Sequence, residues 1–197
     1  MASAATSTPN SRVRSALLDA AYDAAVSGDW ARTRMADVAR SAGVSRQTLY
    51  NEFGSKDALA QAMAMREVEQ FIAGTEAALD EANPDDPIQA VRAAALYTLQ
   101  TAADNPLLKA ALIDDDSGLL SFLTTRGEPA HAAARDSFER YYSAHWPDLP
   151  AQDISLAAET ITRLTISYLM LPGDAPAEIL ATRLADLATK LLRKDRS

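Results

Sequence analysis

The chain has 197 residues, 48% of them hydrophobic, which is enough for one sizeable core or for a small domain joined to a larger one. Its formal net charge of −8 argues against a general nucleic-acid binder. It contains no Cys, which excludes disulfides and thiolate chemistry.

The first elements lie close together near the N-terminus. Residues 1–10, MASAATSTPN, have neither a basic start nor an apolar stretch, so they are predicted to be a flexible tail rather than a signal peptide. Apolar residues spaced for one helical face predict a helix over 11–27, which Gly28 ends. Short helices are expected over 33–41, with its first residue as N-cap, and over 45–53.

The rest of the chain continues this pattern. Apolar residues recur at every third or fourth position, no stretch alternates like a strand, and Gly and Pro fall between the segments. The further expected helices are 55–82, 87–103, 105–113, 119–126, 129–145, 150–171 and 175–193. The prediction is an all-α protein of about nine to ten helices. A helix-turn-helix domain is expected over 11–54 and a larger C-terminal domain over 55–197.

A membrane location is not expected. No uncharged apolar run approaches the ~20 residues that a membrane span needs. The best candidate, ITRLTISYLML at 161–171, is short and contains Arg163. We therefore expect a cytoplasmic protein with no membrane partner.

The charge is unevenly distributed. Residues 12–56 contain seven Lys or Arg against five Asp or Glu, although the whole chain carries −8. A small region suited to phosphate therefore belongs to a chain that is otherwise acidic.

Residues 35–59, MADVARSAGVSRQTLYNEFGSKDAL, have the spacing of a helix-turn-helix. Ala39 is small because the second helix has to cross over it, and Gly43 can adopt the left-handed conformation between the helices. Ser45 can accept hydrogen bonds from the first turn of the second helix. The inward positions are Met35, Val38, Ala39, Val44 and Leu49. Such a unit presents the N-terminal end of its second helix to a DNA major groove.

The outward side chains fit that use. Arg46 and Gln47 can each make paired hydrogen bonds to base edges, with Arg preferring guanine and Gln adenine. Lys56 places a charge beside backbone amides that also favour an anion. Hydroxyls suited to phosphate oxygens come from Thr33, Thr48 and Tyr50.

The string VARSAGVSRQTLYNEFGSKDAL strongly resembles the signature of TetR-type transcriptional regulators, GVS-x-x-TLY-x-x-F-x-SK-x-x-L. The resemblance implies an all-helical homodimer whose first three helices bind DNA and whose C-terminal domain binds a small effector and the partner subunit. It implies phosphate contacts at Thr33, Ser45, Thr48, Tyr50 and Lys56 and base contacts at Arg46, Gln47 and Asn51. Arg34 completes the expected DNA-binding set.

Glu52 departs from the family pattern, because many members carry an aromatic residue or His there. An acid at this position could accept a hydrogen bond from cytosine. It could instead pair with Arg46 or Lys56 within the chain, and this intramolecular role is the favoured one.

The last two expected helices carry apolar stripes: Ile154, Ala157, Ala158, Ile161, Leu164 and Tyr168 on one, and Ile179, Leu180, Leu184, Leu187 and Leu191 on the other. Stripes of this kind usually pack within the chain's own core. The resemblance implies that these two helices also form a four-helix bundle with those of a second copy. Two-fold symmetry would let the dimer read two half-sites.

An effector pocket is expected between the long helix and the helices that follow it. Its candidate lining residues are Leu96, Leu99, Leu112, Leu119, Phe122, Phe138, Arg163 and Ile166. Their apolar character suggests a lipophilic effector such as a fatty acyl compound, a hydrocarbon or an aromatic, although core packing explains the apolar members equally well. Arg163 could pair with a ligand carboxylate or, as favoured, with Glu159 one helical turn earlier.

Neither a metal, nor a cofactor, nor a catalytic site is expected. The run Asp114–Asp116 is better interpreted as a helix break than as a metal loop, whose ligands alternate along the chain. The chain lacks the motifs of nucleophilic hydrolases, phosphate loops and zinc proteases. The sequence thus predicts a ligand-responsive repressor that binds a palindromic operator as a dimer. The alternative is a helical small-molecule-binding or adaptor module without sequence-specific DNA binding.

Overall fold

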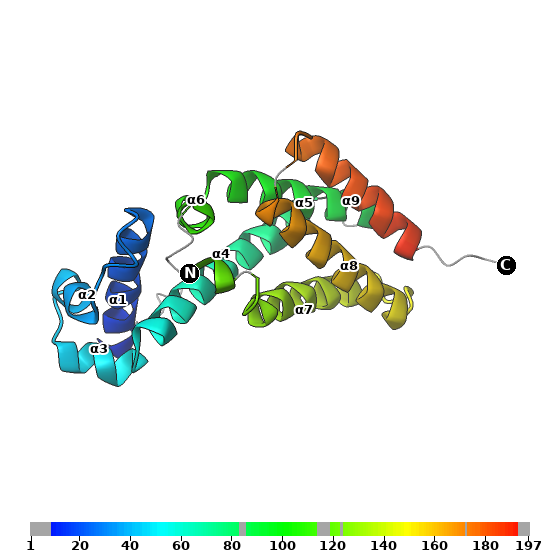
Figure 1. Cartoon of the computed structure of the whole chain (residues 1–197). Helices are drawn as coiled ribbons and strands as arrows, with labels where there is room; N and C mark the ends of the chain where they lie inside the picture. The colour runs from blue at the N-terminus through cyan, green and yellow to red at the C-terminus, as the bar shows by residue number, and fades with distance from the viewer. Residues whose placement is uncertain (1–8, 83–85, 114–118, 123, 172, 193–197) are drawn as a thin grey trace. The chain divides into compact units, whose positions relative to one another are not determined.

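The computed structural model describes residues 9–82, 86–113, 119–122, 124–171 and 173–192. In this part of the chain every regular element is helical (Figure 1), which confirms the predicted all-α class. The elements are α1 (Pro9–Val26), α2 (Met35–Ser41), α3 (Arg46–Phe53), α4 (Lys56–Glu81), α5 (Pro87–Asp104), α6 (Pro106–Ile113), the 3-10 helix η2 (Leu119–Phe122), α7 (Glu128–His145), α8 (Ala151–Met170) and α9 (Ala177–Leu192). Most of the expected boundaries lie within two residues of these.

The prediction of a helix over 119–126 is wrong beyond the first turn. Among the described residues of this segment, only Leu119–Phe122 is helical, as one turn of 3-10 helix. The backbone N–H of Gly127 donates to the carbonyl of Thr124 at 3.0 Å and closes a separate turn. Thr124 and Thr125 are β-branched and polar, which makes them poor residues for extending a helix. The first eight residues of the predicted tail and the expected end of the last helix at Arg193 lie outside the described residues.

The chain forms two compact units. Unit 1 comprises the chain up to Arg66 together with Pro106–Phe122, and unit 2 comprises Glu67–Asn105 together with the chain from Leu123 onwards. The helix-turn-helix segment predicted over 11–54 lies wholly in unit 1. Helix α4 begins in unit 1 and ends in unit 2.

The core of unit 1 forms beneath the helix-turn-helix. Leu17 of α1, Leu49 of α3 and Met63 of α4 have no exposed surface. The predicted inward positions Val38 and Ala39 are also buried, at 2% and 1% exposure. Burial of each large apolar side chain contributes about 1.5–3 kcal/mol, so this core fixes α3 on its neighbours.

The core of unit 2 is built mainly from α5, α7, α8 and α9. The small residues Ala90 of α5 and Ala181 of α9 are almost wholly buried, which allows these two helices to approach closely. Most of the apolar stripe expected on α8 and α9 packs into this core, whereas Ile179 remains 47% exposed. Most residues of the two stripes therefore pack within the chain's own core.

Two tyrosines of α7 fasten this helix to the segments on either side of the α4–α5 connection. The buried Tyr142 hydroxyl donates to the carbonyl of Pro87 at 2.7 Å, and Tyr141 donates to the carbonyl of Leu79 at 2.9 Å. Burial raises the pKa of Tyr142 far above its ordinary value, so the phenol stays protonated and keeps donating.

Among the described residues, no helix is long and apolar enough to cross a membrane.

Candidate nucleic-acid interface

The turn between α2 and α3 forms for local reasons. Gly43 has a φ of +68°, the left-handed conformation predicted for it. The backbone N–H of Val44 donates to the carbonyl of Ala39 at 2.9 Å, and Ser45 Oγ accepts from the N–H of Thr48 at 3.0 Å. The predicted glycine turn and serine N-cap are both confirmed, and together they fix the start of α3.

The two faces of α3 differ sharply in exposure. Leu49 is fully buried and Phe53 is 9% exposed, while Tyr50 between them is 49% exposed. The exposed side chains of this helix are Arg46, Gln47, Tyr50 and Asn51. The structure therefore gathers the predicted base-contacting residues on one solvent-facing side of α3.

Some of these polar groups already bind one another. Gln47 Nε2 donates to Asn51 Oδ1 at 2.7 Å, and the hydroxyls of Ser45 and Thr48 lie 2.8 Å apart. The side chains of Arg46 and Tyr50 make no hydrogen bond or ion pair with any described residue. Their polar groups are thus available to an external partner.

Before α2, the structure corrects one capping prediction. Thr33 does not cap α2, because its hydroxyl donates to the carbonyl of Asp29 at 2.9 Å. The N-cap position belongs to Arg34, whose backbone N–H donates to Asp37 Oδ2 at 3.2 Å. The side chain of Arg34 is exposed and that of Thr33 is half-buried.

Lys56 is directed toward the loop between α1 and α2. Its Nζ donates to the carbonyls of Trp30 and Ala31, at 2.5 Å and 3.2 Å, and lies 4.9 Å from the centroid of the Trp30 ring. Partial burial lowers the pKa of Lys56 from its ordinary value. An ammonium group has three N–H donors, so two are engaged within the chain and one is left for the predicted phosphate contact.

Glu52 has an intramolecular partner, but not one of the two expected. Its Oε1 lies 2.8 Å from Arg14 Nη1, in α1. The expected pairing with Arg46 or Lys56 is wrong. Arg46 lies six positions earlier on α3, off the face of Glu52, and Lys56 is held by the carbonyls near Trp30.

The predicted effector-binding residues fall in both units. Leu119 and Phe122 are buried in the core of unit 1, whereas Leu99 is buried in the core of unit 2 with Leu96 and Phe138 packed against it. Leu112 in unit 1 and Ile166 in unit 2 are half-buried. Core packing thus accounts for most of this set, and a pocket lined by it stays a prediction.

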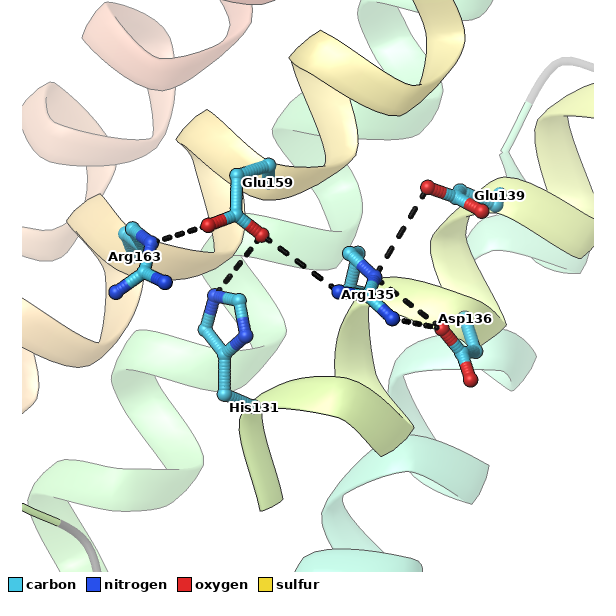
Figure 2. Close-up of polar contacts among 6 residues, drawn as sticks. All are labelled: His131, Arg135, Asp136, Glu139, Glu159 and Arg163. Carbon is cyan, nitrogen blue, oxygen red and sulfur yellow. Dashed lines mark hydrogen bonds and ion pairs between the residues drawn. The ribbon is translucent and has the colours of Figure 1, made fainter. Parts of the chain in front are cut away.

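Arg163 pairs with Glu159 (Figure 2), which confirms the favoured prediction. The same carboxylate lies 3.5 Å from His131 Nε2 and 3.9 Å from Arg135 Nη1, both on α7. The hydrogen bond from Arg163 is the main reason that the pKa of Glu159 is lowered. Neither of these two α7 residues was predicted from the sequence. Their i,i+4 spacing shows that they share a helix face, but not that this face meets Glu159.

The acidic run Asp114–Asp116 lies outside the described residues. Within the described ranges, no group of three or more His, Asp or Glu side chains could hold a metal ion.

Comparison with known proteins gives matches along most of the chain. Residues 17–63 match the family model of bacterial regulatory proteins of the tetR family, and residues 86–190 match the model of the bacterial tetracyclin repressor C-terminal domain. The chain is 32% identical over 178 residues to the HTH-type transcriptional regulator AlkX of Mycobacterium tuberculosis, covering 90% of this chain and 83% of that protein.

Solved structures agree with these matches. The crystal structure of the TetR family repressor AlkX from Dietzia sp. strain DQ12-45-1b, implicated in biodegradation of n-alkanes, is 30% identical with a TM-score of 0.74, covering 96% of this chain and all of that one. A TetR-family regulator from Mesorhizobium loti shares the fold at 21% identity, with a TM-score of 0.61 and coverage of 94% of this chain and 96% of that one.

Proposed function

The chain belongs to the TetR family of bacterial regulatory proteins, and from this premise we propose that it represses transcription by binding a palindromic operator as a homodimer. Members of this family are ligand-responsive, DNA-binding regulators and not enzymes. The same holds for this chain. The alternative of an adaptor module without DNA binding is left without support.

The exposed face of α3 is the observation that carries the proposal. Arg46 and Gln47 lie exposed at the start of this helix, where a recognition helix meets base edges, while Leu49 anchors the helix in the core. Thr33, Arg34, Ser45, Thr48, Tyr50, Asn51 and Lys56 are the proposed flanking contacts to DNA. A single helix-turn-helix reads few base pairs, which favours a dimer with half-sites about 34–36 Å apart, or a multiple of this distance.

We place the dimer interface on the exposed sides of α8 and α9. Leu156 of α8 and Ile179 of α9 are 52% and 47% exposed, although both helices bury their other faces within unit 2. Large apolar side chains left exposed on neighbouring helices favour contact with a partner subunit.

The proposed effector is an apolar small molecule, a hydrocarbon or a fatty acyl compound. Support comes from the Dietzia relative, which is 30% identical and is implicated in biodegradation of n-alkanes. The effector and DNA favour different conformations of the protein. The effector therefore weakens DNA binding, and DNA weakens effector binding by the same factor. Because the partner is the operator, the proposed location is the cytoplasm.

Selection from a library of random DNA duplexes at about 0.15 M salt tests the operator proposal, since this salt partly suppresses sequence-independent phosphate attraction. We expect a palindromic sequence to be enriched. A folded, dimeric protein that enriches no sequence would contradict the proposal.

The enriched duplex then serves as a probe for the effector. A medium-chain n-alkane, the fatty acid of the same length and a simple aromatic are each added to the complex, and release of DNA is measured by fluorescence anisotropy. Release by the alkane or the fatty acid is the expected result. Release by the aromatic alone would overturn the proposed effector class.

A further inference from the structure

The C-terminal end of α3 is held by a side chain from α1. The Nη1 atom of Arg14 lies 2.8 Å from Glu52 Oε1, and its guanidinium carbon lies 4.8 Å from the centroid of the Phe53 ring. Glu52 and Phe53 are the last two residues of α3. One guanidinium therefore contacts both the charged and the buried residue at the end of the proposed recognition helix.

A second cation–π contact follows the turn between α3 and α4. Gly54 ends α3 with a φ of +73°, and Lys56, the first residue of α4, lies over the Trp30 ring. Two cation–π contacts thus flank the α3–α4 turn, one from Arg14 and one from Lys56. A planar guanidinium can stack on an aromatic ring and bind a carboxylate at the same time, whereas an ammonium group is a point charge.

Glu52 is the one acidic residue of α3. Duplex DNA carries one negative charge per about 1.7 Å of its axis, so a free carboxylate on the recognition helix would be repelled. The side chain of Glu52 is 18% exposed, and its carboxylate is bound by Arg14. The pair neutralises this carboxylate on the helix that is proposed to meet DNA.

We propose that Arg14 is a positioning residue for DNA binding, which acts by neutralising Glu52, while the contact with Phe53 holds its guanidinium beside that carboxylate. This inference rests on the proposed function, since it assumes that α3 meets DNA. Arg14 then strengthens DNA binding through Glu52, and its own contact with phosphate is not required. Action through Glu52 and direct contact with phosphate predict different results when Glu52 is also changed.

A double-mutant cycle with Arg14→Met and Glu52→Gln separates them. Affinity is measured by fluorescence anisotropy for the enriched duplex and for a scrambled duplex of equal composition. We expect Arg14→Met to weaken binding about tenfold, and the double variant to bind within about twofold of Glu52→Gln alone. The same coupling is expected on both duplexes, because phosphate repulsion does not depend on sequence.

Arg12→Met is the matched control. Arg12 is an exposed arginine of the same helix and makes no ion pair with a described residue. Its substitution removes the same charge from α1. We expect Glu52→Gln not to rescue Arg12→Met, so the effects of these two changes multiply.

Arg14→Lys separates charge from packing, because it keeps the cation and loses the planar stack on Phe53. We expect this variant to bind DNA more tightly than Arg14→Met. Thermal unfolding of each variant shows whether the protein is still folded. Independent effects of Arg14→Met and Glu52→Gln in folded proteins would overturn the inference.

The same measurements separate this inference from the proposed function. A wild-type protein that binds both duplexes equally would contradict the operator proposal. The coupling of Arg14 to Glu52, measured on the scrambled duplex, would still decide the inference.

Discussion

Basic side chains have different surroundings on α3 and on the facing sides of α7 and α8. On α3, Arg46 is exposed and makes no ion pair with a described residue. Between α7 and α8, Arg135 and Arg163 both lie at the carboxylate of Glu159 (Figure 2). A paired cation is already compensated within the chain, whereas an unpaired one is compensated by solvent or by a partner.

The two sites therefore differ in pairing, because Arg46 has no acidic partner among the described residues, whereas both arginines at Glu159 have one. From the sequence, Arg163 could pair with a ligand carboxylate, because it interrupts an apolar stretch, or, as favoured, with Glu159. In the structure its guanidinium forms an ion pair with Glu159, which also belongs to α8. Arg46, by contrast, has its donors free for a base edge.

The largest expected effect comes from the buried side of α3. Leu49→Ala removes a fully buried side chain and should lower the free energy of unfolding by about 2–5 kcal/mol. Chemical denaturation followed by circular dichroism measures this change. Tyr50→Phe, its exposed neighbour, should change the unfolding free energy by less than about 0.5 kcal/mol and weaken operator binding instead. Equal destabilisation by both variants would contradict the assignment of the two faces.

Arg46→Ala tests the unpaired cation directly. It should weaken operator binding by about 1–3 kcal/mol and relax the preference at one base pair. Arg163→Ala removes the same charge from the paired network and should leave the enriched sequence unchanged. Titration of both variants against the operator and its single-base variants measures this. A comparable loss for Arg163→Ala would break the distinction between paired and unpaired cations.

Lys56 is an intermediate case, because it is engaged within unit 1 and is also a proposed phosphate contact. Lys56→Met should weaken binding to all sequences alike and reduce the slope of log affinity against log salt by about one. It should also lower the thermal stability, because the carbonyls of Trp30 and Ala31 lose their donor. An unchanged salt slope would show that Lys56 acts only within the chain.

Local features of the fold could be predicted because they depend on residues close in the chain. The left-handed Gly43 and the Ser45 cap require only a turn and the first N–H groups of the next helix. Burial of Leu49 follows from helical periodicity. These features positioned the exposed residues of α3 correctly from the sequence alone.

The contacts that could not be predicted join distant parts of the chain. Arg14 and Glu52 are 38 residues apart, and no spacing rule pairs them. Gly74 inside α4 is another case, since a glycine usually destabilises a helix. A Cβ at this position would lie 1.9 Å from the hydroxyl oxygen of Tyr97, so the small residue is explained by the packing of α5. Such contacts depend on how helices pack, which the local pattern does not specify.

The smallest expected effect concerns the paired network and its dependence on pH. The pKa of Glu159 is lowered in the folded chain, chiefly by the hydrogen bond from Arg163. A carboxyl group of this kind contributes stability that is complete above its unfolded pKa of about 4.3 and is lost as the pH falls through the lower folded pKa. Glu159→Gln should therefore make the unfolding midpoint fall less steeply on acidification below about pH 5.

Thermal unfolding at several acidic pH values measures this slope. Glu69→Gln is the control, because Glu69 is exposed on α4 and makes no ion pair with a described residue. It should leave the slope as it is in the wild type. If Glu159→Gln also left the slope unchanged, the cations around Glu159 would be mere neighbours rather than stabilising partners, and the contrast with Arg46 would rest on the DNA measurements alone.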